Sequence, residues 1–161
     1  MSDWYNKYEE KVFNLLKNEK TRDIRFFRIE EMLRMAERAD KYSLTCKECL
    51  SFKNRLENGY ESLKKAVQYP GKERKELDKL ETQMSSHMKK VHGFYPPLYF
   101  LYLYSAIGIL IFMVIAFIIY LIFPSLSLLN IMAVAFAAGV IIGQIKGHKK
   151  DNKIKREGKI L

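Results

Sequence analysis

The stretch from Pro96 to Ile145 constrains the fold more than any other part of this 161-residue chain, because it contains no Lys, Arg, Asp, Glu or His. Its first apolar run, Leu98 to Phe123, is followed by Pro124, which breaks a helix. At about 1.5 Å per residue this run covers the roughly 30 Å hydrocarbon core of a bilayer. The second run, Leu126 to Ile145, reaches the minimum of about 20 residues. The sequence therefore predicts an antiparallel transmembrane hairpin.

A buried hairpin inside a soluble domain is the alternative, but no other part of the chain is large enough to cover it. Basic residues near the spans indicate the orientation, since positively charged flanks stay on the cytoplasmic side. Lys89 and Lys90 precede the first span, and a basic tail follows the second. We therefore expect an integral protein of the plasma or inner membrane with both termini cytoplasmic. Met1 to Lys20 lacks the apolar segment of a signal peptide, so the first span is expected to direct insertion.

The tail from residue 146 to residue 161 carries half of the net charge of +10. A basic cluster beside a membrane span is attracted to anionic lipid by about 1 kcal/mol per residue. Nucleic acid is the alternative partner, and we favour lipid because the cluster lies next to the span. The predicted lipid-binding residues are Lys146, Lys149, Lys150, Lys153, Lys155 and Arg156.

Residues 1–95 are predicted to form a small cytoplasmic helical bundle, because apolar residues recur at steps of three and four and strand signals are absent. The fold class is therefore all-α: a helical domain (1–95), a transmembrane hairpin (96–145) and a basic tail (146–161). The first helix could alternatively lie on the membrane surface, given its amphipathic pattern. Thr21 or Asp23 is expected to cap the second helix. The four expected cytoplasmic helices span about 3–18, 22–42, 44–69 and 72–92, and the two transmembrane helices about 98–123 and 126–145.

The third and fourth helices are predicted to form an antiparallel hairpin, because Pro70-Gly71 is a strong turn signal between them. Its apolar stripes include Cys46 and Cys49 on one helix and His87 on the other. The spacings of Cys46 to Cys49 and of His87 to His92 match those of tetrahedral Zn²⁺ ligands. The antiparallel return brings Cys49 and His92 to nearly the same height. The sequence therefore predicts a structural Zn²⁺ site formed by Cys46, Cys49, His87 and His92.

Two features argue against this site. On an ideal helix His87 lies about a turn and a half short of the cysteines, and residues five apart point about 140° away from each other. The helix must therefore loosen before His92, and Gly93 would permit it. Buried cysteines without metal and a redox Cys-x-x-Cys motif are the alternatives, although the redox motif lacks its usual βαβ context. Four protein ligands would leave no open position for zinc catalysis. The clamp would fix the domain where the chain enters the bilayer.

The second span carries small residues at strict intervals of four, which allow close approach of another helix. Packing against the first span, where Ser105 and Gly108 offer a matching surface, and self-association between copies are both open. The residues of this stripe are Ala135, Gly139, Gly143 and Gly147.

These patterns predict a membrane-anchored, non-enzymatic scaffold or accessory subunit that binds an unidentified protein, or a second copy of itself. A small oligomeric pore with a cytoplasmic sensor domain is the alternative function, but the spans offer little polar lining. An enzyme is disfavoured because no nucleophile, base and orienting group can be assembled from these motifs. We expect no nucleic-acid partner and no small-molecule substrate.

Overall fold

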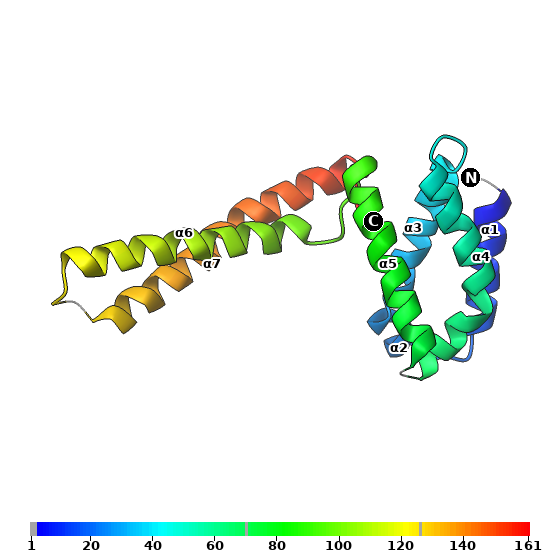
Figure 1. The fold of residues 1–161 in the computed structure, drawn as a ribbon, viewed down its shortest axis with the longest axis horizontal. Coiled ribbons are helices and arrows are strands. Elements are labelled where there is room, and N and C mark those ends of the chain that lie inside the picture. The colour runs from blue at the N-terminus through cyan, green and yellow to red at the C-terminus, as the bar shows by residue number, and fades with distance from the viewer. Residues whose placement is uncertain (1–2, 70, 126) are drawn as a thin grey trace. The chain divides into compact units, whose positions relative to one another are not determined.

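The computed structural model describes residues 3–69, 71–125 and 127–161, which form helices and no β-strand (Figure 1). The predicted all-α fold class is confirmed. The chain forms two compact units, Met1–Phe94 together with Leu161, and Tyr95–Ile160. The helices are α1 (Asp3–Leu16), α2 (Thr21–Phe26), α3 (Ile29–Tyr42), α4 (Lys47–Gln68), α5 (Lys72–Val91), α6 (Tyr99–Ile122) and α7 (Leu128–Arg156).

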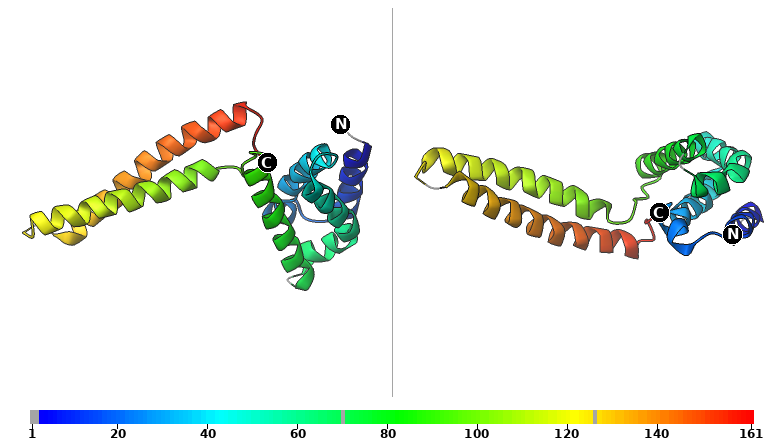
Figure 2. Two further views of the ribbon diagram at one scale, coloured as in Figure 1. Left: turned by 45° about the horizontal axis from the view of Figure 1, so that its top comes forward. Right: turned by 90° about the horizontal axis from the view of Figure 1, so that it is seen from below.

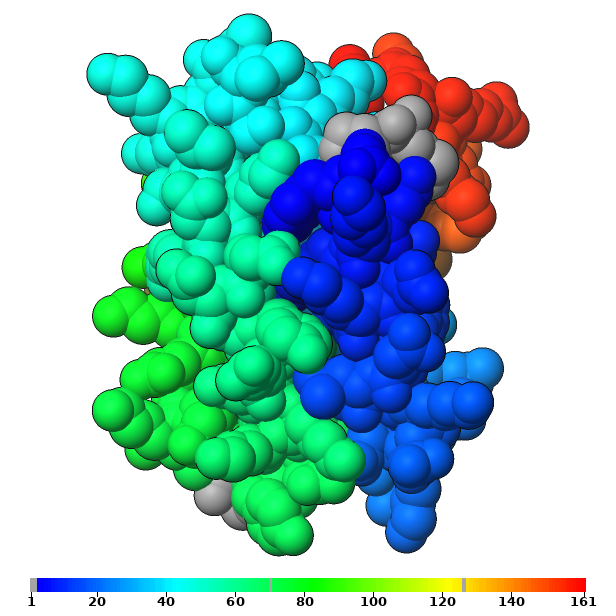
Figure 3. All heavy atoms as spheres, turned by 90° about the vertical axis from the view of Figure 1, so that its right-hand side faces the viewer, coloured from blue at the N-terminus to red at the C-terminus, as the bar shows by residue number. Residues whose placement is uncertain are grey.

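The first unit is a helical bundle in which α3 packs against α1, α4 and α5, and α4 and α5 run antiparallel. Figure 3 shows α1, in blue, lying alongside α4, in cyan to green. The core consists of the apolar positions that recur at steps of three and four. Its fully buried members include Tyr8, Val12, Ile29, Met32, Cys49, Met84 and Met88.

The predicted single helix from 22 to 42 is two helices, α2 and α3, so this expectation was wrong. Arg28 adopts a left-handed conformation with φ of 53°, which interrupts the regular helical backbone. Phe26 therefore turns outward and is 70% exposed, although its spacing places it on the core stripe. Thr21 and Asp23 lie inside α2 rather than capping it, because Lys20 is the N-cap and provides no side-chain hydrogen bond.

Steps of three and four from His87 lead to Val91, but the C-terminal end of α5 buries a different residue. Val91 is 61% exposed, whereas Met88 is fully buried. The helix ends at Val91, and Gly93 has a positive φ of 70°, a conformation that glycine adopts at little cost. The backbone N–H of Phe94 donates a hydrogen bond to the carbonyl of Met88. His92 is the C-cap of this helix, and its backbone N–H still bonds to the carbonyl of Met88.

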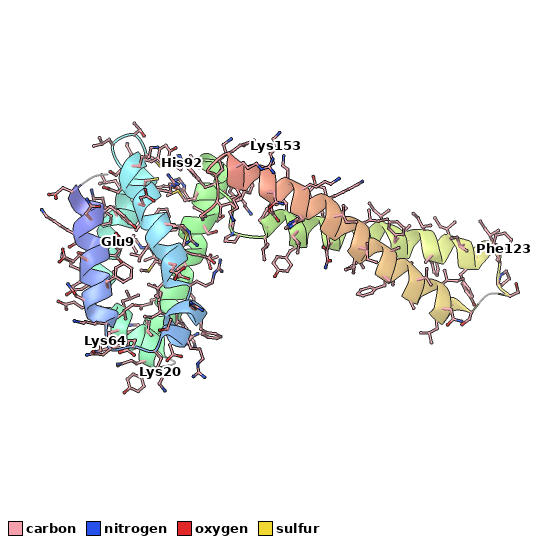
Figure 4. All side chains as sticks on the ribbon, turned by 180° about the vertical axis from the view of Figure 1, so that it is seen from behind. Glu9, Lys20, Lys64, His92, Phe123 and Lys153 are labelled. Carbon is pink, nitrogen blue, oxygen red and sulfur yellow. The ribbon has the colours of Figure 1, made fainter. Side chains whose placement is uncertain are left out.

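The second unit is an antiparallel pair, with α6 and α7 side by side along their length in both orientations of Figure 2. Both helices are long and apolar enough to cross a membrane. Phe123 lies at the tip of this hairpin and Lys153 at the opposite end (Figure 4). Helix α7 does not stop at Ile145 but continues to Arg156, so most of the basic tail is helical.

Small residues bring the two helices into backbone contact. A Cβ atom added to Gly143 would lie 2.5 Å from the Cα of Ser105, and one added to Gly147 would lie 2.5 Å from the Cα of Leu101. Atoms cannot approach so closely, so only glycine fits at these crossings. Asp151 continues the same four-residue interval, and its two carboxylate oxygens accept hydrogen bonds from the backbone N–H groups of Phe100 (3.0 Å) and Leu101 (2.9 Å).

Candidate metal centre

Cys46, Cys49, His87 and His92 come together at one end of the first unit. Cys46 is the N-cap of α4, and Cys49 lies in the first turn of that helix. His87 lies in the last turns of α5, and His92 is its C-cap. Figure 4 shows His92 at the end of the bundle opposite Lys20 and Lys64. The antiparallel hairpin therefore places the start of one helix beside the end of the other.

The ligand atoms of these four residues all lie within 4.8 Å of one another. The Nε2 atom of His87 is 3.3 Å from the Sγ of Cys46 and 3.5 Å from the Sγ of Cys49. The Nε2 atom of His92 is 3.2 Å from the Sγ of Cys49. Zinc–ligand bonds of 2.0 to 2.3 Å in a tetrahedron imply ligand separations of roughly 3.3 to 3.8 Å. The three sulfur–nitrogen distances of 3.2 to 3.5 Å lie close to these values.

The two obstacles seen in the sequence are resolved at the helix ends. Helix α5 ends at Val91, so His92 lies at its C-cap, where the backbone φ of −108° departs from the regular helical value. The two imidazole centroids lie 5.2 Å apart. Cys46 likewise lies outside the regular helix, with an extended backbone of φ −125° and ψ 113°. The ligands thus converge because two of the four lie in cap positions.

Neighbouring side chains orient both imidazoles. The carboxylate of Glu48 pairs with the Nδ1 atom of His87, which leaves Nε2 directed at the cysteines. The ring of His92 stacks on Tyr42, with centroids 4.1 Å apart and planes inclined by 25°. The ring of Phe52 lies 5.6 Å from that of His87. Carboxylate–histidine pairs of this kind fix the tautomer and orientation of metal-binding histidines.

The protonation states of the ligands bear on metal binding. Burial raises the pKa of the Cys49 thiol to about 12, and the neighbouring Cys46 and Glu48 act in the same direction, so a bound metal must displace the proton of this thiol. Burial also lowers the pKa of His92, with His87 adding to the effect, so its imidazole favours the neutral form that binds metal. The N-terminal dipole of α4 stabilises negative charge on the sulfurs, and the C-terminal dipole of α5 stabilises a cation.

Sequence reasoning missed Glu48 and Tyr42 as supporting residues. Glu48 lies between the two cysteines, and its place in the Cys-Lys-Glu-Cys motif was the available signal. Tyr42 is the last residue of α3, so no local pattern connects it with a histidine fifty residues later.

The other predicted site residues lie in the second unit. Gly139, Gly143 and Gly147 face the backbone of α6, and Ala135 is buried on the same helix. The stripe therefore packs within the hairpin. Lys150 is half-buried, with its Nζ 5.5 Å from the ring centroid of Phe100. The remaining predicted lipid-binding residues are exposed on α7: Lys146, Lys149, Lys153, Lys155 and Arg156.

Comparisons with protein-family models, curated proteins and solved structures find no match to this chain. The functional argument therefore rests on the chemistry of its own residues.

Proposed function

We propose that this protein is a non-enzymatic membrane scaffold whose helical domain is clamped by a structural Zn²⁺ ion bound to Cys46, Cys49, His87 and His92. The convergence of two sulfur and two imidazole donors within 4.8 Å of one another is the observation that carries this proposal. Zinc prefers this mixture of thiolate and imidazole ligands. Four protein ligands fill its coordination shell, so the metal would hold structure rather than bind substrate.

The bound metal would connect two helix ends. It joins the start of α4 to the end of α5, beyond which the chain continues to α6. Binding of a structural metal contributes directly to folding free energy, because the unfolded chain offers no preformed site. A zinc-bound domain would therefore present a rigid helical surface to a partner protein.

We further propose that α6 and α7 cross the membrane and that the helical domain and the basic tail lie on the cytoplasmic side. The start of α6 and the end of α7 are joined by the Asp151 hydrogen bonds, which supports their lying on one side of the bilayer. The exposed basic residues of α7 would then contact anionic lipid. A pore is less well supported, because the glycines of α7 face α6 rather than a lumen.

Elemental analysis of the detergent-purified protein tests the metal assignment. We expect about one zinc per chain, lost in Cys46→Ser/Cys49→Ser and in His87→Ala/His92→Ala. His148→Ala is the matched control, since His148 is the third histidine of the chain and lies exposed on α7. Zinc that persists in both double variants, or its absence from the unmutated protein, would contradict the proposal.

A further inference from the structure

A groove of about 590 Å³ opens between α4 and α5, away from the metal ligands. Its length between the levels of Arg55 and Ala66 on α4 is roughly 16 Å. Pockets that bind small organic molecules have volumes of about 300 to 1,000 Å³. None of the four metal ligands lines this groove, so it is a separate feature of the same helical pair. Its apolar lining consists of Met32, Leu56, Leu63, Ala66, Leu77 and Leu80.

The mouth of the groove is open because α4 has no side chain at Gly59. A Cβ atom added to Gly59 would meet no atom within 4 Å. Glycine in the middle of a helix costs up to about 1 kcal/mol relative to alanine. No turn or close helix contact in the structure requires this glycine, and its effect is to leave space over the apolar floor.

The hydroxyl of Tyr8 lies at the floor of this groove and has no protein partner within the described residues. Tyr8 is only 2% exposed, and it reaches the groove from α1, which packs against α3 and α4. Its oxygen is not among the buried side-chain atoms that are sealed from solvent without a partner. The small exposed part of Tyr8 therefore includes this hydroxyl. A hydroxyl that is nearly buried, reached from the groove and not bonded to the protein can donate a hydrogen bond to a ligand there.

Two basic residues, Arg55 and Lys79, line the groove. Arg55 donates one hydrogen bond to the side-chain oxygen of Gln83 (2.8 Å), its guanidinium carbon lies 5.8 Å from the ring centroid of Phe52, and an arginine carries five N–H donors in all. Tyr8 lies near Glu57, whose carboxylate is already bound by Lys11 (2.6 Å) and by the indole N–H of Trp4 (3.0 Å). The other end carries Glu73 and Glu76, which disfavour an anionic group there.

We propose that this groove binds a long-chain carboxylic acid. The carboxylate accepts hydrogen bonds from the Tyr8 hydroxyl and the Arg55 guanidinium, and the alkyl chain lies along Leu63, Ala66 and Leu77. Binding is non-covalent and requires no metal chemistry. The site adds a ligand to the scaffold function and stands or falls separately from the zinc clamp. The sequence led us to expect no small-molecule substrate, and this proposal adds a small-molecule ligand.

Photo-crosslinking of the full-length protein in phosphatidylcholine nanodiscs tests this site. The probe is a diazirine-bearing hexadecanoic acid, and mass spectrometry maps the labelled residues. We expect labelling within 55–66 and 76–83, reduced at least tenfold by excess unlabelled hexadecanoic acid. Labelling of α6 and α7 provides an internal standard for probe dissolved in the lipid. Labelling confined to α6 and α7 would overturn the proposal.

Gly59→Trp fills the groove and is expected to reduce labelling of the α4 and α5 peptides at least tenfold. Glu61→Trp is the matched control, because Glu61 is exposed on the same helix and does not line the groove. Circular dichroism and thermal unfolding check that the Gly59→Trp domain remains folded. Equal labelling of Gly59→Trp and Glu61→Trp would show that the ligand binds elsewhere.

The head group is tested with the methyl ester of the same probe. The unmutated protein is expected to label with the acid at least fivefold more than with the ester, and Tyr8→Phe should lose most of that preference. Tyr8→Phe removes only the hydroxyl and retains the ring that stacks on Trp4. Equal labelling by acid and ester in the unmutated protein would contradict carboxylate recognition.

Discussion

At the scale of single residues, the candidate metal centre depends on side chains that orient its ligands as well as on the ligands themselves. Glu48 holds the Nδ1 side of His87, and Tyr42 supports the face of His92. The sequence spacing identified all four ligands, but it placed His87 and His92 on diverging faces of one helix. The structure places His92 at the C-cap of α5, with its Nε2 atom 3.2 Å from the Sγ of Cys49.

Glu48→Gln is expected to weaken metal binding about 10- to 100-fold, the usual effect of losing a carboxylate that orients a metal-binding histidine. Competition with a chromophoric chelator measures the affinity of the full-length protein. Glu61→Gln is the control, since Glu61 is exposed on the same helix. An unchanged affinity in Glu48→Gln would mean that the carboxylate contributes nothing to ligand orientation.

Glu81→Gln is expected to stabilise the first unit at high pH. Burial raises the pKa of Glu81 from 4.5 to about 7, and Asp78 and Glu31 add to the rise while Arg28 opposes it. The folded state therefore holds this proton more tightly than the unfolded state. The stability that the bound proton contributes is fully present below pH 4.5. It falls as pH rises from 4.5 and is lost once pH passes 7.

Denaturant unfolding at pH 5 and pH 8.5 checks this expectation. The fluorescence of Trp4, the single tryptophan of the chain, reports on the first unit. At pH 8.5 we expect Glu81→Gln to gain about 2 kcal/mol over the unmutated protein, and at pH 5 little or nothing. Glu76→Gln, at an exposed position of the same helix, should change neither value. An equal gain at both pH values would exclude titration of Glu81 as the cause.

At the scale of helices, the close packing of α6 on α7 depends on positions where no side chain fits. The four-residue interval of small residues indicated a close helix contact but left its partner open. The structure places this stripe against α6, where Gly108 and Ser105 lie opposite Gly139 and Gly143. Asp151 extends the contact past the apolar segment by binding the first backbone N–H groups of α6.

Gly143→Leu is expected to separate α6 from α7, because its added atoms would overlap the backbone of Ser105. Overpacking of this kind costs about 1 to 3 kcal/mol. Hydrogen exchange of the protein in detergent, read by mass spectrometry, should be roughly ten to a hundred times faster around the contact. Ala137→Leu, on the exposed side of α7, is the control. Equal exchange in the two variants would mean that the glycine contact does not hold the pair together.

Asp151→Ala is expected to free the backbone N–H groups of Phe100 and Leu101. Loss of a carboxylate at a helix N-terminus costs about 1 kcal/mol. The same measurement should show roughly fivefold faster hydrogen exchange in the first turn of α6 and an unchanged exchange rate in the middle of that helix. Glu157→Ala, beyond the end of α7, is the comparison. Unchanged exchange at the first turn would rule out Asp151 as its cap.

At the scale of the whole molecule, the proposed topology predicts a distinctive protease fragment. The chain has no Lys or Arg between Lys90 and Lys146, so trypsin cannot cut inside the hairpin. In inverted membrane vesicles, trypsin should remove the helical domain and tail and leave a fragment from Val91 to Lys146. In vesicles of the opposite orientation the chain should stay intact. Cleavage from the outside would contradict the cytoplasmic placement of both ends.

The sequence by itself determined the fold class, the apolar hairpin and the set of metal-binding candidates, because each depends on local periodicity, length or residue spacing. Tertiary structure decided where the helices break and what their faces contact. The left-handed Arg28 divides a continuous apolar pattern, and the end of α5 at Val91 leaves His92 at a cap position, 3.2 Å from Cys49. Tyr42 and Asp151 act on residues about fifty positions away. Such contacts depend on how helices pack, and the periodicity of one helix does not specify which distant side chain contacts it.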